Sequence, residues 1–318
     1  MRILITGITG FAGSHLADYF FEEGDHEIYG TVKWRSNREN IRHIESKIKL
    51  LECDIKDAFA MKAVLEESKP DHIFHLAAQS YVPFSWRVPQ ETIDTNITGE
   101  LNLFEGLRGL KMNPMIHIAG SSEEYGLVHP DELPITENNP LRPLSPYAVS
   151  KVAQDFLGYQ YFKSYGMKIV RTRAFNHTGP RRGEVFVTSN FARQLIEVER
   201  GKRQPVLQVG NLDAVRDFSD VRDVVRAYAL ALKKGTPGEV YNIASGKGIK
   251  IADLLKKLIE LTKVEVKIEQ DPDRLRPSDV QLLTGSPEKF QKATGWKPMI
   301  PFEKTLRDLM DYWRSIIK

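Results

Sequence analysis

The chain has 318 residues and a formal net charge of +3, with 41% hydrophobic and 27% charged residues. This balance is that of an ordinary globular protein, and the length allows one large domain or two modest ones. The charge lacks the basic bias typical of nucleic-acid binders, and no apolar run approaches the ~20 residues of a membrane span. We therefore expect neither a nucleic acid nor a membrane as partner.

Cysteine usage and the N-terminus bear on the compartment. The single cysteine, Cys53, excludes a disulfide within the chain and suits a reducing environment. The opening MRILITGITG has a strand-like run followed at once by glycines, and it lacks the longer apolar region of a signal peptide. We expect a cytoplasmic protein in which Cys53 is a packed thiol. His75 should be packed or lie beside a cofactor, and no metal-ligand spacing is present, so we expect no metal site.

Strand-like and helix-like segments alternate through the first half of the chain. Strands are expected at 2–6, 26–32, 49–54, 72–77, 115–120 and 167–175, and helices in the segment that ends at Gly24 and near 57–67, 92–109 and 147–165. This alternation predicts an α/β fold: a Rossmann-type, doubly wound parallel sheet with helices on both faces and right-handed connections.

The pattern changes after Phe175. NHTGPRRGEVF and GNLDAVRDFSD have the composition of polar loops, each followed by a helix, the first at 189–200. A strand at 240–245, a helix in IADLLKKLIELT, a strand in VEVKIE and a C-terminal amphipathic helix then follow. We predict a Rossmann domain at 1–175, joined by parts of 213–245, and a smaller α/β domain at 176–318.

The first strand runs into a glycine turn, GITGFAG. Gly7, Gly10 and Gly13 permit a tight turn and a close approach of the backbone to a pyrophosphate at a helix N-terminus. Because this spacing follows a strand and opens a helix, it predicts a dinucleotide site, to which Thr9 and Phe11 also belong.

The loop after the second strand, TVKWRSNREN, bears on which dinucleotide is bound. Lys33 and Arg35 are basic and no acid precedes Glu39, which favours the 2′-phosphate of NADP over the free ribose of NAD. A solvated basic loop is the alternative. After the third strand, Asp54 and Ile55 are placed to meet the adenine, although Asp54 also suits a simple turn.

Two further motifs carry groups for proton transfer. SPYAVSK places Tyr147 and Lys151 four residues apart on one helix face, where an ammonium lowers the pKa of a nearby phenol. In AGSSEEYG, Ser121 and Glu123 follow the apolar run MIHIA, at a strand end of the kind that bears active sites in parallel sheets. A solvated turn is the alternative for that stretch.

With these motifs, the chain resembles the extended short-chain dehydrogenase/reductase family over essentially its whole length. The resemblance is carried by GITGFAG, HLAAQS, Ser121 and the pair Tyr147 and Lys151. It implies that Tyr147 is the acid/base, that Lys151 also holds the nicotinamide ribose, and that Ser121 hydrogen-bonds the reacting sugar hydroxyl. In HLAAQS it assigns Leu76, Ala77 and Ala78 to the cofactor and Ser80 to the substrate.

Within that family the chain is most similar to the GDP-mannose branch, the GDP-mannose 4,6-dehydratases and GDP-4-keto-6-deoxy-mannose reductases. GSSEEYG and AFNHTGPRRGEVFVT resemble dehydratase stretches and map Glu123 onto a catalytic carboxylate. LRPSDVQLLTGSPEKF resembles reductases at least as closely, and Ser189 and Asn190 stand where dehydratases carry a basic pair. We favour the dehydratase, with the reductase or another nucleotide-sugar epimerase as alternatives.

Either activity implies a GDP-sugar as substrate. The residues assigned to it by motif are Ser80, Ser122, Asn176, Val187, Arg216, Arg276 and Asp279. The two arginines would neutralise phosphates, with surface salt bridges as the alternative, and Asp279 would accept a hydrogen bond from the nucleoside. Glu124 should point away from the site, as a structural or solvated residue. The family implies a homodimer or homotetramer.

Overall fold

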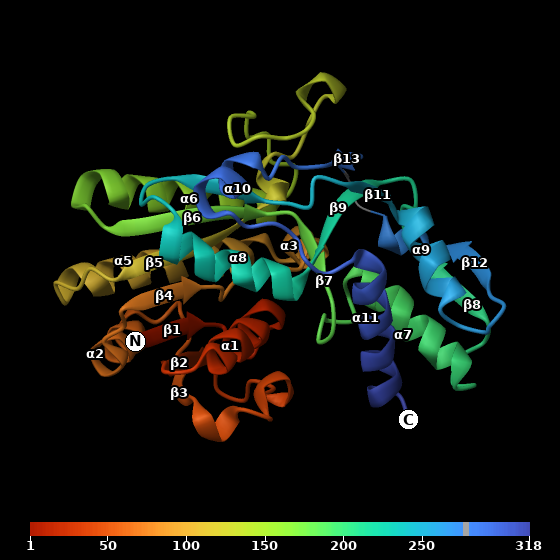
Figure 1. Ribbon diagram of the computed structural model, residues 1–318, viewed down its shortest axis with the longest axis horizontal. Coiled ribbons are helices and arrows are strands. Elements are labelled where there is room, and N and C mark those ends of the chain that lie inside the picture. The colour runs from red at the N-terminus through yellow and green to blue at the C-terminus, as the bar shows by residue number, and fades with distance from the viewer. Residues whose placement is uncertain (276–279) are drawn as a thin grey trace.

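The computed structural model describes residues 1–275 and 280–318, and a seven-stranded parallel sheet forms its larger part (Figure 1). The strand order is β10–β6–β5–β4–β1–β2–β3, and every neighbouring pair is parallel. The strands are β1 (Arg2–Thr6), β2 (Glu27–Val32), β3 (Lys49–Glu52), β4 (His72–His75), β5 (Met115–Ser121), β6 (Lys168–Ala174) and β10 (Val240–Ile243). The order reverses between β1 and β4, which is where ligands bind in such sheets. The predicted Rossmann-type fold is confirmed.

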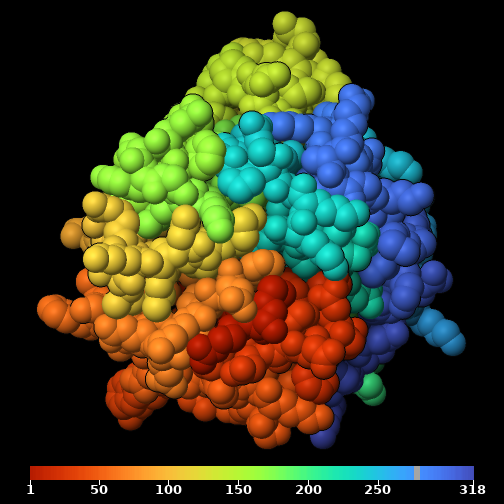
Figure 2. All heavy atoms as spheres, turned by 60° about the vertical axis from the view of Figure 1, so that its left-hand side comes forward, coloured from red at the N-terminus to blue at the C-terminus, as the bar shows by residue number. Residues whose placement is uncertain are grey.

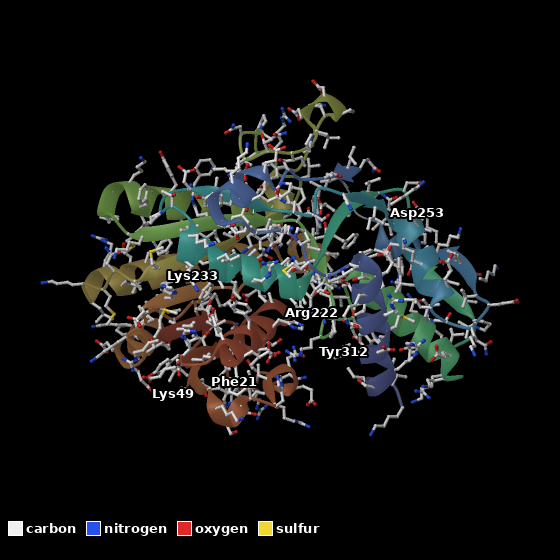
Figure 3. All side chains as sticks on the ribbon, in the orientation of Figure 1. Phe21, Lys49, Arg222, Lys233, Asp253 and Tyr312 are labelled. Carbon is white, nitrogen blue, oxygen red and sulfur yellow. The ribbon has the colours of Figure 1, made fainter. Side chains whose placement is uncertain are left out.

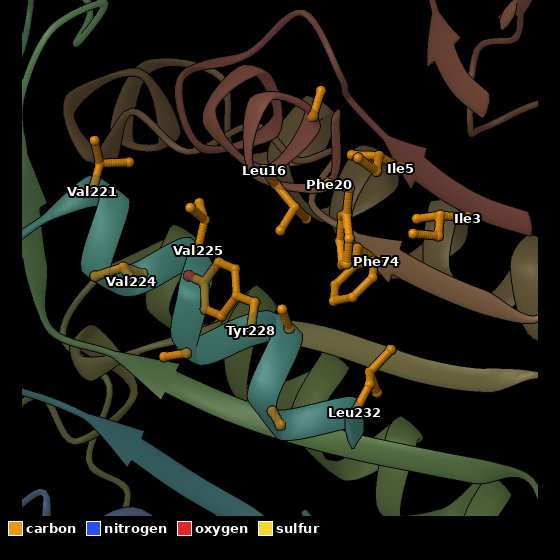
Figure 4. Packing of buried hydrophobic residues seen from close by; sticks show 14 of the residues in the cluster. Ile3, Ile5, Leu16, Phe20, Phe74, Val221, Val224, Val225, Tyr228 and Leu232 are labelled. Atoms are coloured by element: carbon orange, nitrogen blue, oxygen red, sulfur yellow. The ribbon is translucent and has the colours of Figure 1, made fainter. Parts of the chain in front are cut away.

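Helices cover both faces of this sheet. One face carries α1 (Phe11–Glu23) and α8 (Val221–Lys234), and the other carries α2 (Ala58–Ser68), α5 (Gly99–Gly109) and α6 (Pro146–Tyr165). Figure 4 shows Val225 of α8 facing Leu16 of α1, and both residues belong to one buried cluster with Tyr228. Each fully buried side chain of this size contributes about 1.5–3 kcal/mol, so the two helices are held firmly on the sheet.

The helix expected at 92–109 is divided into three segments. It consists of α4 (Pro89–Ile93), a π-helical turn (Asp94–Thr98) and α5, and a short α3 (Val82–Arg87) precedes it. Inside the π-helical turn, the Asn96 amide donates to Gln79 O at 3.1 Å and to Ser150 Oγ at 2.8 Å. The extra residue of the π turn therefore faces inward and ties this segment to α6.

The remaining chain forms a smaller α/β part beside the large sheet, visible on the right of Figure 1. Its strands are β7 (Asn176–Thr178), β8 (Val206–Val209), β9 (Val215–Asp220), β11 (Gly248–Lys250), β12 (Lys267–Gln270) and β13 (Leu282–Leu283). Its helices are α7 (Val187–Glu199), α9 (Ile251–Glu260) and α11 (Phe302–Ile316), whereas α10 (Glu288–Thr294) packs against β10 and α8 of the larger part. Arg222, labelled in Figure 3, lies in the first turn of α8 and donates a hydrogen bond to Asp308 of α11 at 2.7 Å, linking the two parts.

Two expected loops contain strands. β7 lies in NHTGPRRGEVF and β9 in GNLDAVRDFSD, so both stretches were wrongly assigned as loops throughout. The polar residues of β9 are buried. Asp217 accepts hydrogen bonds from Ser245 N at 2.8 Å and Gly246 N at 2.9 Å, whereas Ser219 Oγ has no partner among the described residues. A strand whose polar groups bond to other segments of the chain has no apolar signature in its own sequence.

The chain between β5 and α6 forms an excursion at 127–144, the knob at the top of Figure 2. Within it, Arg142 donates two hydrogen bonds, of 2.8 and 2.7 Å, to the Glu132 carboxylate. Ile135 N donates to Thr284 O at 2.9 Å, which connects the excursion to the C-terminal part of the chain. Across the described ranges, no helix is long and apolar enough to cross a membrane. Cys53 is buried, as predicted for a packed thiol.

Candidate active site

A cavity of about 1270 Å³ opens at the carboxyl ends of the large-sheet strands and extends to the smaller α/β part. It is larger than the roughly 300–1,000 Å³ of an ordinary ligand pocket, so it has room for two ligands. Of the residues selected from the sequence, its lining contains Gly7, Thr9, Gly10, Phe11, Gly13, Lys33, Ile55, Leu76, Ala77, Ala78, Ser80, Ser121, Ser122, Glu123, Tyr147, Lys151, Asn176, Val187 and Arg216. Arg35 and Asp54 lie outside the lining, and Arg276 and Asp279 lie outside the described residues.

The glycine turn packs closely against its neighbours. Gly7 has φ +70°, and a Cβ there would lie 2.9 Å from Ala77 Cα. A Cβ on Gly13 would lie 2.3 Å from Gly7 O. Gly10 caps α1 without a side chain, so the first-turn N–H groups stay open toward the cavity. An open helix N-terminus attracts anions, and these residues therefore fit the pyrophosphate of a dinucleotide.

The basic loop after β2 presents one cation to the cavity. Lys33 lines it and pairs with Asp54, at 3.2 Å between Nζ and Oδ2. Arg35 has φ +60° and its guanidinium lies 4.1 Å from the ring centroid of Trp34, which is 68% exposed. Of these two residues, Lys33 therefore lines the cavity and Arg35 does not.

At the end of β5, Ser121 and Glu123 share a tight turn. Ser121 Oγ accepts a hydrogen bond from Glu123 N at 3.2 Å, and both residues line the cavity. Glu124 is turned back into the protein, where Oε1 accepts from Ser121 N at 2.7 Å. Of the two expectations for Glu124, a structural role is confirmed, whereas solvation is wrong because the side chain is fully buried.

Four charged side chains behind this turn form what we call the buried ion cluster: Glu124, Asp155, Arg171 and Arg173. Arg173 Nε lies 3.0 Å from Glu124 Oε2 and 2.8 Å from Asp155 Oδ2, while Arg171 bonds to Asp155. Burial raises the pKa of Glu124 well above its usual range, and Asp155 raises it further. The cluster joins the turn after β5 to β6 and α6, and so fixes the backbone of Ser121.

Helix α6 carries Tyr147 and Lys151. Ser145 caps the helix by accepting from Ala148 N at 3.1 Å, which places Tyr147 in its first turn. Lys151 Nζ donates to Ala119 O at 2.9 Å and lies 6.0 Å from the Tyr147 ring centroid. Burial lowers the pKa of Lys151 to about 8, opposed by the charges of Glu100 and Glu124.

Burial and a serine dominate the surroundings of the Tyr147 phenol. Burial raises the pKa of Tyr147 above its usual value, and a hydrogen bond with Ser121 lowers it. Lys151, whose ammonium donates to Ala119 O, is not among the largest influences on this pKa, so the lowering expected from Lys151 stays a prediction. Of the polar neighbours, Ser121 therefore stabilises the phenolate most directly.

Sequence reasoning missed several lining residues. Arg182 places its guanidinium 3.5 Å from the Phe186 ring centroid and 4.8 Å from that of Phe11, and burial lowers its pKa to about 10. His177 stacks on Phe11 with ring centroids 5.8 Å apart. The basic pair in PRRGE was the available signal for Arg182, whereas nothing local marks His177.

A second open helix end faces the same cavity. Helix α7 begins at Val187 after Phe186, which provides no side-chain cap, and both residues belong to the lining. Arg216 of β9 and Asn176 of β7 line the cavity as well. Within the part of the chain that the structure describes, no group of three or more His, Cys, Asp or Glu could hold a metal ion.

The chain has relatives among known proteins, both in sequence and in structure. Residues 4–309 match the family described as GDP-mannose 4,6 dehydratase. The GDP-6-deoxy-D-mannose reductase of Pseudomonas aeruginosa is 34% identical over 100% of this chain and 98% of its own length. GDP-mannose 4,6 dehydratase 2 of Arabidopsis thaliana is 35% identical over 97% of this chain and 85% of its own length. The solved structure of RMD from Pseudomonas aeruginosa complexed with NADPH is 32% identical, covers 100% of both chains and has a TM-score of 0.86.

Proposed function

Because this chain belongs to the GDP-mannose 4,6-dehydratase family of nucleotide-sugar enzymes, which use NAD(P), we propose that it is itself a GDP-mannose 4,6-dehydratase. The observation that carries the proposal is the position of Glu123, which lines the same cavity as Ser121, Tyr147 and Lys151. A carboxylate beside the acid/base pair supplies the second proton acceptor that dehydration requires. The expected product is GDP-4-keto-6-deoxy-mannose.

In this reaction, different residues of the chain carry out the two proton transfers. NADP, which the glycine turn and Lys33 would hold, would supply a hydride acceptor that is regenerated within the same turnover, so the reaction would be redox-neutral. Tyr147 takes the proton of the C4 hydroxyl, which Ser121 holds by a hydrogen bond, and Lys151 favours the phenolate by its charge. The resulting ketone acidifies the C5 proton, which Glu123 removes and passes to the departing C6 hydroxyl, so that water leaves. When the hydride returns to C6, the proton that Tyr147 took from the C4 hydroxyl is returned to C5, and all residues regain their starting forms.

Two open helix ends suit two diphosphates in one cavity. The N-terminus of α1 is placed for the cofactor and that of α7 for the GDP-sugar, with Arg216 contributing a positive charge. Lys33 favours NADP over NAD. We propose, accordingly, that residues 1–175 with parts of 213–245 bind the cofactor and that 176–318 bind the nucleotide sugar. A homodimer or homotetramer remains our expectation.

A reductase of the GDP-4-keto sugar is the second candidate, and similarity to a reductase supports it. The Pseudomonas aeruginosa reductase aligns with 100% of this chain at 34% identity, and the Arabidopsis thaliana dehydratase aligns with 97% of it at 35%. A reductase requires Ser121, Tyr147 and Lys151 but no second base, so it leaves Glu123 without a chemical role.

The deciding experiment incubates the protein with GDP-mannose and a catalytic amount of NADP⁺ and follows the sugar by mass spectrometry. A dehydratase yields a product lighter by one water with no net NADPH. Glu123→Gln should then lower turnover about 10²–10⁴-fold, with NADP binding kept, because a positioned base contributes that much. The control Glu91→Gln removes a lining carboxylate that pairs with Lys56 at 3.0 Å, and turnover should persist.

Unchanged GDP-mannose contradicts the dehydratase. Consumption of the 4-keto sugar together with NADPH would then identify the reductase. Tyr147→Phe should stop either reaction while leaving cofactor binding intact.

A further inference from the structure

Tyr81 and Phe186 meet across the cavity from the two parts of the molecule. Tyr81 lies between β4 and α3 in the larger part, whereas Phe186 directly precedes α7 in the smaller part. Their ring centroids are 5.9 Å apart and the rings are inclined at 73°, an edge-to-face contact. Both half-buried residues line the cavity, and the proposed chemistry uses neither of them. A contact between two walls of a cavity closes part of it to solvent.

Hydrogen bonds fix Tyr81 on its side of the cavity. Gln79 Oε1 accepts from Tyr81 N at 2.6 Å, and the backbone of Gln79 exchanges hydrogen bonds of 2.8 and 3.1 Å with the Asn96 amide. Asn96 also donates to Ser150 Oγ at 2.8 Å, and Ser150 Oγ donates to Tyr147 O at 2.7 Å. A continuous series of hydrogen bonds therefore fixes the backbone of Tyr81 relative to the proposed acid/base.

Phe186 is held on the other side by the first turn of α7 and by a cation. Phe186 O accepts a hydrogen bond from Asn190 N at 2.7 Å, and the Arg182 guanidinium lies 3.5 Å from the Phe186 ring centroid. Burial raises the pKa of Tyr147, and the charge of Arg182 is among the influences that lower it, so the guanidinium lies near the phenol. The contact between Tyr81 and Phe186 therefore crosses the cavity beside the proposed reacting centre.

A redox-neutral dehydration has a stage at which its sugar must not escape. When sugar C4 has given a hydride to NADP⁺ and its hydroxyl proton to Tyr147, the sugar is a ketone that is still bound. Escape of this ketone would leave NADPH and the proton on the enzyme, with no sugar to take the hydride back. A closure over the site prevents that loss and excludes water during the reaction.

We propose that Tyr81 is a positioning residue whose ring contact with Phe186 closes the cavity over the reacting sugar and retains the ketone until the hydride returns. One aromatic contact shifts an equilibrium by only about 2- to 10-fold, so the closure still opens for entry and release. The proposal rests on the proposed function, and one of its tests is therefore independent of turnover.

The first experiment supplies GDP-mannose with excess NADP⁺ and measures the fraction of turnovers that release NADPH with an equal amount of GDP-4-keto sugar to which no hydride has returned. In Tyr81→Ala this fraction should rise about 2- to 10-fold above the wild-type level. Tyr81→Phe keeps the ring and should match wild type. An unchanged fraction in folded Tyr81→Ala overturns the proposal, and so does a raised fraction in Tyr81→Phe, which would assign the effect to the hydroxyl.

Trp86→Ala is the matched control. Trp86 belongs to α3, lines the same cavity and is 37% exposed, and no aromatic contact among the described residues involves it. Its loss should leave the released fraction at the wild-type level. An equal rise in Trp86→Ala would show that any opening of this rim has the same effect, and would overturn the assignment to Tyr81.

Phe186→Leu tests the contact from the other side, and it replaces Tyr81→Ala if that variant does not fold. Phe186 provides no side-chain cap for α7, so the helix should keep its start. The released fraction should rise as in Tyr81→Ala. The double variant should release no more than the larger single effect, because both changes remove one contact. Effects that add overturn the proposal.

The second experiment needs no turnover. NADPH and GDP-mannose are bound together, a pair that does not react because GDP-mannose has no ketone to reduce, and acrylamide is used to quench the NADPH fluorescence. Quenching should be about 2- to 10-fold stronger in Tyr81→Ala than in wild type or Tyr81→Phe. Equal quenching in all three overturns the closure. If wild type leaves GDP-mannose unchanged, the proposed function fails, and quenching still decides whether Tyr81 closes the cavity.

Discussion

The buried ion cluster and the basic loop after β2 contain the same residue types in opposite environments. In the cluster, the side chains of Arg173 and Asp155 are 6% and 2% exposed. In the loop, the paired side chains of Lys33 and Asp54 are 52% and 40% exposed. Water has been removed from the first set, so each charge there depends on its partner, whereas water still solvates the second set.

This difference in exposure separates charged side chains that stabilise the fold from those that are available to bind a ligand. Arg173 and Glu124 hold the turn after β5 and have no remaining freedom to bind anything else. Lys33 can exchange Asp54 for a phosphate at little cost, because an exposed ion pair contributes only about 0–1 kcal/mol. Three predictions test this contrast.

The largest effect should come from breaking the buried ion cluster. Arg173→Met leaves Glu124 and Asp155 buried with less positive charge, and should lower the free energy of unfolding by about 3–5 kcal/mol. Urea unfolding measures it. Arg108→Met, which removes an exposed pair with Glu105, is the control and should change stability by about 0–1 kcal/mol. Similar losses in both variants would contradict the contrast.

An intermediate effect on stability should come from His15, a buried residue of α1. Its ring Nε2 is hydrogen-bonded to Pro180 O at 2.9 Å. Burial lowers the pKa of His15 from 6.5 to about 4. Because the pKa of His15 is lower in the folded than in the unfolded protein, neutral His15 contributes its full share to the free energy of unfolding above the unfolded-state pKa. This contribution is lost as the pH falls toward the folded-state pKa. At about pH 5 this loss is about 2 kcal/mol.

The measurement compares urea unfolding of wild type and His15→Gln at about pH 7.5 and about pH 5. The variant should lose less stability between these conditions than wild type, by about 2 kcal/mol. Part of the pH dependence should persist in it, because burial also lowers the pKa of His75 and His117 to about 3. The same pH dependence in both proteins would show that His15 does not titrate in this range.

The smallest effect on stability should come from the basic loop. Lys33→Ala should change the free energy of unfolding by less than about 1 kcal/mol, yet weaken NADP binding about tenfold relative to NAD. Arg35→Ala should have a smaller effect on that ratio, since Arg35 lies outside the cavity lining and stacks on Trp34. Fluorescence titration with both cofactors measures the ratio. Equal weakening of NADP and NAD in Lys33→Ala would remove the case for a 2′-phosphate contact.

Local patterns were enough for much of the fold and for part of the site. The alternation of strands and helices predicted the large sheet because its parallel strands are apolar runs with a clear period. The glycine turn and the Tyr147–Lys151 spacing depend on residues within one turn or one helix, so they could be identified from neighbours in the chain. The helix expected at 92–109 exists but is interrupted by a π-helical turn. That turn depends on a hydrogen bond to Ser150, which lies far away in the sequence.

Long-range partners could not be predicted in this way. Alternation along the chain and the family resemblance separated Glu123, which lines the cavity, from Glu124, but nothing within AGSSEEYG identified Arg173 of the neighbouring strand as the partner of Glu124. The same limit applies to β9, whose Asp217 is satisfied by a segment near Ser245. In each case the partner comes from a distant part of the chain.

The sequence by itself therefore determined the family, the sheet and the identity of the groups that can transfer protons, because these follow from short-range spacing and turn chemistry. Only the tertiary structure decided which charges are buried with a partner and which face the cavity. Burial and pairing set the ionisation of Lys151 and Glu124, and both depend on the surroundings that the whole fold creates.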